Sequence, residues 1–393
     1  MKKHLALIIL TSFVITAFLM MAFKKDQSTA DSSHLPKNNH SKNNHPKIQA
    51  AILLDVSNSM DGLIEQAKAQ LWNMVSVMGK ATCDNVTPQI EIALYEYGRP
   101  NNEVKEGYVK QLSGFTTDLD KLSQTLFSLH TNGGDEYCGH VMYTSLTKLN
   151  WDTSAANYKV IFIAGNEDFM QGDISYTRAC AEAKKKGVII NTIYCGDKMD
   201  GLREHWNVTG ECGNGSFTNI NQDSKIEDIS TPYDSTLFTL NEKLNETYIA
   251  YGAYGNTNYA NQAKMDKMNY SLSKSVAAKR VGVKGKKVLY KNTHWDLVDA
   301  EESDSSFVSK VDMKTLPDSL QKKSRAELKQ IVRSKNLQRE KIQKDIDQIS
   351  TRREAYISAE RKKLVSKNNT ATLETEIEKI IKQQAKRFNM VVQ

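Results

Sequence analysis

Residues 51–60 read Ala-Ile-Leu-Leu-Asp-Val-Ser-Asn-Ser-Met, and this stretch decides the fold. Its apolar half has the length and composition of a buried strand, and an Asp-x-Ser-x-Ser sequence follows directly. A loop at the carboxyl end of a parallel strand faces the crevice in which open α/β sheets bind ligands. Asp55, Ser57 and Ser59 supply hard oxygen donors, which suit Mg²⁺, Mn²⁺ or Ca²⁺. The alternative interpretation is helix capping, because Ser and Asp are favoured caps.

Strand-like and helix-like segments alternate on the carboxyl side of this stretch. Apolar runs of strand length occupy residues 50–54, 90–95, 160–164 and 188–194. Between them, apolar side chains recur at three- and four-residue spacings, as expected for helices within 64–78, 142–149 and 176–186, and a closing helix is expected over 237–251. The pattern predicts an α/β domain over residues 48–252, with an open, doubly wound, mostly parallel six-stranded sheet flanked by helices.

Further motifs lie at suitable distances from the first. Residues 95–98 read Tyr-Glu-Tyr-Gly, residues 132–139 read Asn-Gly-Gly-Asp-Glu-Tyr-Cys-Gly, and residues 163–167 read Ile-Ala-Gly-Asn-Glu. With these motifs the chain resembles the von Willebrand factor A (vWA) family, whose metal-ion-dependent adhesion site (MIDAS) begins with Asp-x-Ser-x-Ser. The resemblance covers residues 48–300 and is strongest to bacterial exported vWA proteins of unassigned role.

The resemblance implies a set of metal ligands. In the family the two serines bind the cation directly, the first aspartate acts through water, and a threonine in the second loop and an aspartate after the fourth strand complete the shell. Here Asp135 stands in the second loop, and residues 164–165 are Ala-Gly, which leaves Asn166 as the nearest oxygen donor. The predicted metal site therefore comprises Asp55, Ser57, Ser59, Asp135 and Asn166. A directly bound Asp135 would make the cation less electrophilic towards a partner's carboxylate.

Three functions are compatible with these residues. The first is binding of a protein partner, in which an acidic residue of the partner completes the coordination of the cation; this chain would then not be an enzyme. The second is a scaffolding role with a purely structural or degenerate metal site. The third is a zinc hydrolase that uses His130, Asp135, Cys138 and His140. The third is disfavoured because Cys138 and His140, two residues apart on the expected helix, point to different faces.

The amino terminus predicts export. Two lysines precede an apolar run over residues 5–23, and two more follow it, which is typical of a signal peptide or an uncleaved membrane anchor. Residues 24–47 are polar, with repeated Asn-Asn-His units, and are expected to form a disordered linker. We therefore expect a periplasmic or cell-envelope location, which disfavours a nucleic-acid partner.

Five cysteines accompany this export signal: Cys83, Cys138, Cys180, Cys195 and Cys212. In an oxidising compartment one or two disulfides are expected, and one cysteine must stay unpaired within the chain. The spacing does not determine which cysteines pair.

The carboxyl-terminal third is harder to interpret. Residues 253–320 are expected to have little regular structure, apart from a short strand-like piece at 286–290, and the His-Trp-Asp-Leu-Val-Asp sequence at 294–299 has no evident role. Residues 321–393 predict a helical tail that begins with a capping box of Ser324 and Glu327.

Charge dominates this tail. Residues 321–393 hold 19 Lys and Arg against 9 Asp and Glu, whereas the whole chain has a formal net charge of +7. The excess favours anionic partners, including a membrane surface, although a solvated helix is the simpler interpretation. Lys335, Arg339 and Arg353 interrupt the apolar seam, so the pattern predicts a weak coiled coil with limited self-association, and a central domain that folds without the tail.

Overall fold

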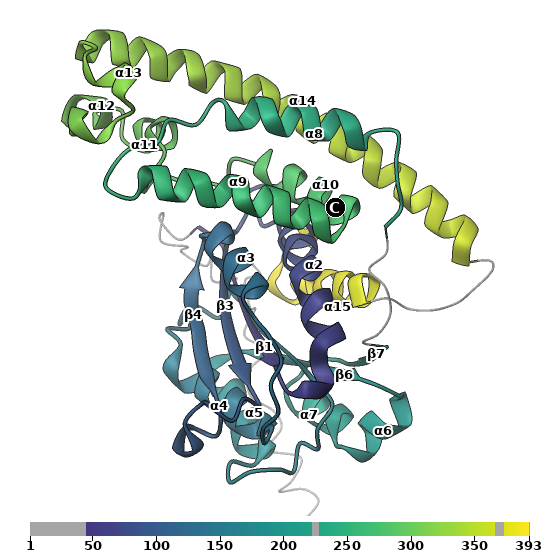
Figure 1. Cartoon of the computed structure of the whole chain (residues 1–393). Helices are drawn as coiled ribbons and strands as arrows, with labels where there is room; N and C mark the ends of the chain where they lie inside the picture. Colours follow the sequence, from purple (N-terminus) through teal and green to yellow (C-terminus); the bar gives the residue numbers. More distant parts are fainter. Residues whose placement is uncertain (1–44, 222–227, 366–372, 393) are drawn as a thin grey trace, which may run out of the picture. The chain divides into compact units, whose positions relative to one another are not determined.

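The computed structural model describes residues 45–221, 228–365 and 373–392 (Figure 1). The predicted signal or anchor at 1–23 and nearly all of the predicted linker lie outside these residues. In the part of the chain that the structure describes, no helix combines the length and apolarity needed to cross a bilayer.

Six strands form one sheet within the described residues, as the sequence predicts, in the order β4-β3-β1-β5-β6-β7. All neighbouring strands are parallel except the pair β3 and β4. The bounds are β1 Lys47–Asp55, β3 Gln89–Tyr97, β4 Lys110–Thr116, β5 Tyr158–Gly165, β6 Ile189–Cys195 and β7 Phe217–Ile220. The sequence located the four longest buried strands but neither β4, whose residues are all partly or fully exposed, nor the short β7.

Helices cover both faces of this sheet because β1 is buried on both sides. Successive side chains of a strand point to opposite faces; accordingly, Ile52 and Leu54 join one apolar cluster and Ala51 and Leu53 join another. The first cluster includes residues of α2 (Asp61–Met78) and α3 (Leu119–Phe127), and the second includes residues of α4 (Cys138–Lys148) and α5 (Tyr176–Lys186). Short helices α6 (Lys198–Arg203) and α7 (Trp206–Cys212) follow β6.

The closing helix expected at 237–251 is present, but both of its predicted bounds are wrong. Helix α8 runs from Asp234 to Asn245. Residues 249–251 are instead extended and pair with the segment before α11: Tyr251 N donates to Trp295 O at 2.8 Å, and Leu297 N donates to Ile249 O at 2.8 Å. The buried side chains of this extended segment continue the apolar pattern of the helix, which is why the sequence placed the end too late.

The expectation of little regular structure in residues 253–320 is also wrong. This region forms α9 (Gly255–Leu272), α10 (Lys274–Lys284), α11 (Leu297–Ser303), α12 (Phe307–Lys310) and α13 (Asp318–Gln321), with turns rather than a strand at 286–290. Helix α9 has an even distribution of Asn, Tyr and Lys and no pronounced apolar face, so periodicity could not reveal it. Buried polar contacts hold it instead, such as Trp72 Nε1 donating to Asn269 Oδ1 at 2.8 Å.

The tail is not a separate coiled coil. Helix α14 (Arg325–Val365) begins with the predicted capping box, in which Ser324 N donates to Glu327 Oε2 at 2.8 Å and Glu327 N donates to Ser324 Oγ at 3.2 Å. The seam of α14 contacts helices of its own chain, α8, α10 and α11 among them, and Ile346 is fully buried there. Residues 45–393 form one compact unit, so the predicted boundaries at 252 and 320 do not divide the chain into separate compact units.

The charged residues that interrupt the seam are docking contacts. Arg339 Nη1 lies 2.7 Å from both Asp296 Oδ2 and Asp299 Oδ1, which gives a role to the acidic sequence at 294–299. Arg353 Nε lies 2.8 Å from Asp234 Oδ1 at the start of α8. These guanidinium groups are buried in the contact between α14 and the rest of the chain.

Helix α15 (Leu373–Ala385) completes the apolar cluster beside α2. Its Gln384 accepts a hydrogen bond from Tyr158 Oη at 2.9 Å and donates one to Asn191 Oδ1 at 2.7 Å, which ties the helix to two strands of the sheet. The chain then pairs β8 (Val391–Val392) with β2 (Ala81–Thr82).

One disulfide joins Cys180 of α5 to Cys212 of α7, with Cα atoms 5.8 Å apart. Cys83, Cys138 and Cys195 are free. The expectation of at least one disulfide and an unpaired cysteine is confirmed.

Candidate functional site

The Asp-x-Ser-x-Ser sequence forms a tight loop at the carboxyl end of β1. Asp55 is the last strand residue, and its Oδ1 accepts a hydrogen bond from Ser57 N at 2.8 Å. A short 3₁₀ helix, Asn58–Met60, follows and leads into α2. Ser57 occupies the capping position of that 3₁₀ helix but its side chain makes no capping hydrogen bond, so the capping interpretation does not account for its hydroxyl.

Four of the five predicted site residues lie together. Ser57 Oγ and Ser59 Oγ are 3.1 Å apart, and Ser59 Oγ lies 3.4 Å from Asn166 Oδ1. Asn166 follows β5, the neighbour of β1 in the sheet, which brings the two loops to the same edge. The second loop also contacts the first, because Asn132 N donates to Val56 O at 2.8 Å.

Glu136, rather than Asp135, is the carboxylate that the second loop turns toward this cluster. Asp135 is exposed, and the hydrogen bond found for its carboxylate comes from Tyr137 Oη at 3.5 Å. The side chain of Glu136 and the carboxylate of Asp55 both lie next to Gly98. A Cβ added at Gly98, which has a φ of +85°, would lie 2.8 Å from Glu136 Cγ and 3.0 Å from Asp55 Oδ1. A glycine at this position therefore lets the side chain of Glu136 approach Asp55.

A lack of space for a side chain also explains the glycine at position 165. A Cβ at Gly165 would collide with the hydroxyl of Tyr97 and would lie 3.0 Å from Asp55 Oδ2. That hydroxyl donates to Ala164 O at 3.0 Å and is fully buried. The space in which the family resemblance would place an aspartate side chain is thus filled by Tyr97.

The site is electrostatically suited to a cation. Burial raises the pKa of Asp55 to about 7, with Glu167 adding to the effect, while hydrogen bonds from Ser57 oppose it. Burial also raises the pKa of Glu136 to about 7, and the charges of Asp55 and Glu167 raise it further. Asp55 Oδ2 is buried without a hydrogen-bond partner in the described structure. A buried carboxylate oxygen with no donor is unfavourable unless a proton or a cation satisfies it.

The residues of the zinc alternative do not converge. Cys138 is fully buried and points to Tyr97, with Sγ 3.7 Å from its Oη. His140 lies instead against Gly107, in the loop after β3. Among the described residues, no group of three or more His, Cys, Asp or Glu side chains could hold a metal ion. The cluster around Ser57 is of another kind, because its donors are mainly hydroxyl and amide oxygens.

The loops around the site expose apolar and acidic side chains. Val104, Met170 and Met199 are 66%, 60% and 61% exposed, and they follow β3, β5 and β6, whose carboxyl ends share one edge of the sheet. Exposed carboxylates outnumber exposed cations on these loops and on the loop before α4. The carboxylates are those of Glu103, Glu106, Asp135, Asp173 and Asp197, and the cations are Lys105, Lys198 and Arg203. The surface at the carboxyl ends of these strands is therefore acidic and carries a few exposed apolar side chains.

No family model and no curated protein matches the chain. Solved structures similar to it include two that are named as von Willebrand factor A domains. The VWA domain of SpRpn10 has 18% identity and a TM-score of 0.33, covering 44% of this chain and 88% of that one. The von Willebrand factor type A structure from Catenulispora acidiphila has 14% identity and a TM-score of 0.33, covering 45% and 39%.

Proximal thread matrix protein 1 from the mussel byssus, with a zinc-occupied MIDAS motif, has 13% identity and a TM-score of 0.33, covering 46% of this chain and 43% of that one. At these identities and TM-scores the likeness says nothing of function, which must be argued from this chain's own contacts.

Proposed function

We propose that this chain is an extracytoplasmic vWA-type protein that binds a protein partner through a divalent cation at the carboxyl end of its sheet. The observation that carries the proposal is the convergence of Ser57, Ser59 and Asn166 beside Asp55, whose Oδ2 is buried and has no partner in the described structure. Three neutral oxygen donors next to a buried carboxylate match the preferences of Mg²⁺, Mn²⁺ and Ca²⁺.

The ligand set that we propose differs from the one that the sequence predicts. Ser57, Ser59, Asn166 and Glu136 would face the cation, with Asp55 behind them, whereas Asp135 would remain outside. A bound cation would supply positive charge that attracts a partner's oxygen ligand and would offset the repulsion between the carboxylates of Asp55 and Glu136. It would not make this chain an enzyme.

The chemistry of the loops constrains the partner. One carboxylate of the partner would complete the coordination of the cation, as expected from the family resemblance. The acidic surroundings would repel further acidic residues, so the partner surface around that carboxylate should carry basic side chains. Met170 and Met199 offer flexible apolar contacts, of the kind that is common at binding surfaces.

Export is supported by two independent features. The lysine-flanked apolar run at the amino terminus matches a secretory signal or anchor. The Cys180–Cys212 disulfide is a bond typical of oxidising compartments and rare in the cytosol. Membrane attraction and self-association through the basic tail stay predictions from the sequence.

Calorimetric titration of the purified chain with Mn²⁺, Mg²⁺ and Ca²⁺ tests the proposal. We expect saturable binding of at least one cation in the wild type and its loss in Ser57→Ala. Ser319→Ala, an exposed serine of α13, is the matched control and should bind like the wild type. Equal binding by the wild type and Ser57→Ala would refute the site, and a partner interaction that survives both EDTA and Ser57→Ala would favour the scaffolding role.

A further inference from the structure

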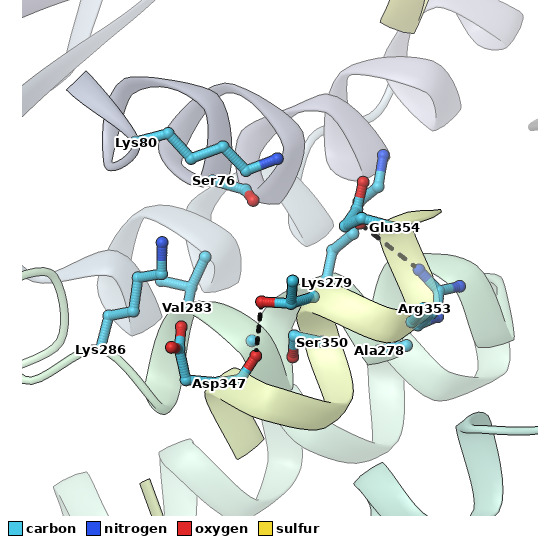
Figure 2. Close-up of a pocket in the computed structure, with 12 residues that line it drawn as sticks. Ser76, Lys80, Ala278, Lys279, Val283, Lys286, Asp347, Ser350, Arg353 and Glu354 are labelled. Atoms are coloured by element: carbon cyan, nitrogen blue, oxygen red, sulfur yellow. Dashed lines mark hydrogen bonds and ion pairs between the residues drawn. The ribbon is translucent and has the colours of Figure 1, made fainter. Parts of the chain in front are cut away.

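A cavity lined by none of the proposed metal-site residues lies between α2, α10 and α14 (Figure 2). Its volume is about 350 Å³, at the lower end of the range of about 300 to 1,000 Å³ that is usual for small-molecule sites. Lys80, just after α2, and Lys286, just after α10, line one side, and Asp347, Ser350 and Glu354 on α14 line the other.

Two buried polar atoms at this cavity lack hydrogen bonds in the described structure. They are Ser350 Oγ and Arg353 Nη1. Arg353 is 1% exposed, and its Nη1 lies 3.8 Å from Glu354 Oε1, beyond hydrogen-bond length. Burying such groups without partners is costly, which points to a ligand or water that satisfies them.

Some of the charges that line the cavity are already neutralised by protein groups. Lys279 Nζ lies 2.6 Å from Glu374 Oε1, and Arg353 Nε lies 2.8 Å from Asp234 Oδ1. The ammonium groups of Lys80 and Lys286 and the carboxylate of Asp347 form neither a hydrogen bond nor an ion pair with the described residues. The cavity is thus left with two unpaired ammonium groups on one side, and with Asp347 and the weakly paired Glu354 on the other.

These opposite charges face the same space without meeting. Burial lowers the pKa of Lys286, Asp347 raises it and Lys80 lowers it again, as expected if all three side chains border one cavity. Figure 2 shows the ammonium groups of Lys80 and Lys286 across from the side chains of α14. Lys80 and Lys286 are long and flexible, yet they make no ion pair with Asp347 across the cavity. A small molecule can therefore lie between the lysines and this carboxylate.

We propose that this cavity binds a small zwitterion, a free amino acid or a short peptide. The ligand's carboxylate would lie between Lys80 and Lys286, and its ammonium group would lie beside Asp347. Ser350 Oγ and Arg353 Nη1 would supply the remaining hydrogen bonds. An inorganic anion would satisfy only the lysine side of the cavity, because it would leave Asp347 without a positively charged partner.

Calorimetric titration of the full chain tests this proposal. The probes are the standard set of free amino acids at concentrations up to about 10 mM. Each amino acid that binds is compared with its N-acetyl derivative, which lacks the ammonium charge, with its amide, which lacks the carboxylate, and with inorganic phosphate. We expect the free amino acid to bind and each derivative to bind about tenfold more weakly or worse.

Charge-removing variants locate the binding. Lys286→Met and Asp347→Asn should each weaken binding of the amino acid about tenfold or more. Lys344→Met and Asp345→Asn are matched controls on α14 that do not line the cavity, and they should bind like the wild type. Lys80→Met replaces Lys286→Met if the latter lowers the melting temperature.

Three results would overturn the proposal. The first is binding of no amino acid, and the second is undiminished binding by both Lys286→Met and Asp347→Asn. The third is binding of phosphate or of the N-acetyl derivative that equals binding of the free amino acid, since this would make the cavity a simple anion site.

Discussion

Asp135 and Glu136 are neighbours in the chain, yet the structure gives them opposite environments. In the loop before α4, Asp135 is exposed, whereas the side chain of Glu136 approaches Asp55. Gly98 makes this approach possible because it leaves the space that Glu136 fills. Which carboxylate of the second loop approaches Asp55 therefore depends on a residue of a different loop.

Exchanging each carboxylate for its amide separates the two roles. We expect Glu136→Gln to weaken Mn²⁺ binding about tenfold or more, because a charged ligand is lost from a partly buried site. Asp135→Asn should change the affinity by less than about threefold, since it removes an exposed charge that water screens and that does not join the cluster around Ser57. Calorimetric titration at fixed ionic strength measures both, and a larger effect for Asp135→Asn would restore the ligand set predicted from the sequence.

At the scale of elements, buried ion pairs join the tail to the domain. Arg339 is 3% exposed and Asp296 is fully buried, so removing one partner would leave an uncompensated charge. Breaking such a pair destabilises a protein strongly, because the remaining charge cannot regain its hydration. Arg339 and Arg353 interrupt the apolar seam of α14 and so disfavour a coiled coil. The same two residues hold α14 against the rest of the chain.

Replacing Arg339 with methionine should lower the free energy of unfolding by about 3 to 5 kcal/mol. The matched control is Arg333→Met on the exposed side of the same helix, for which we expect a change within about 0.5 kcal/mol. Urea unfolding followed by circular dichroism measures both. Equal effects of the two substitutions would mean that Arg339 does not anchor α14.

Acid should loosen the start of α15. Burial would raise the pKa of Glu374, but Lys279 and Arg361 outweigh it and hold the pKa at about 2, against an ordinary 4.5. A depressed pKa stabilises the folded state above the ordinary value, and this contribution is lost as the pH falls from 4.5 towards about 2. The melting temperature of the wild type should fall more steeply across this window than that of Glu374→Gln, and parallel curves would exclude the effect.

For the whole molecule, the tail belongs to the core. Ile346, Ile377 and Ile381 are at most 3% exposed and lie in the same apolar cluster as residues of β1 and α2. Removing α14 and α15 would expose this cluster. The sequence suggested that the central domain folds without the tail, and the structure leads to the opposite expectation.

Truncation before Ser324 should therefore abolish most of the cooperative thermal transition, because large apolar surfaces of α2 and α10 would face water. Scanning calorimetry of the truncated and full chains decides this. A truncated chain that melts with an undiminished transition would show that the domain is independent after all. Truncation before residue 45 is the control, because the compact unit begins there.

By itself the sequence determined the class of the sheet, the positions of its four longest buried strands and the loop that starts the candidate site. These features are local: a run of apolar residues, a turn and a polar motif directly after a strand are readable without knowing what surrounds them. The Ser57 and Ser59 hydroxyls, Asp55 and the capping box at Ser324 were found in this way, whereas Asn166 was found through the family resemblance.

Only the tertiary structure decided which carboxylate of the second loop lies beside Asp55 and how the tail packs on the domain. Glu136 is turned inward by space at Gly98, and Gly165 is required by the hydroxyl of Tyr97; neither contact leaves a pattern in its own segment. Likewise Arg339 and the acidic pair at 296 and 299 are separated by about forty residues, and each alone resembles a solvated surface charge. Whether a charge faces water or an opposite charge is set by distant parts of the chain, because burial is a property of the assembled fold.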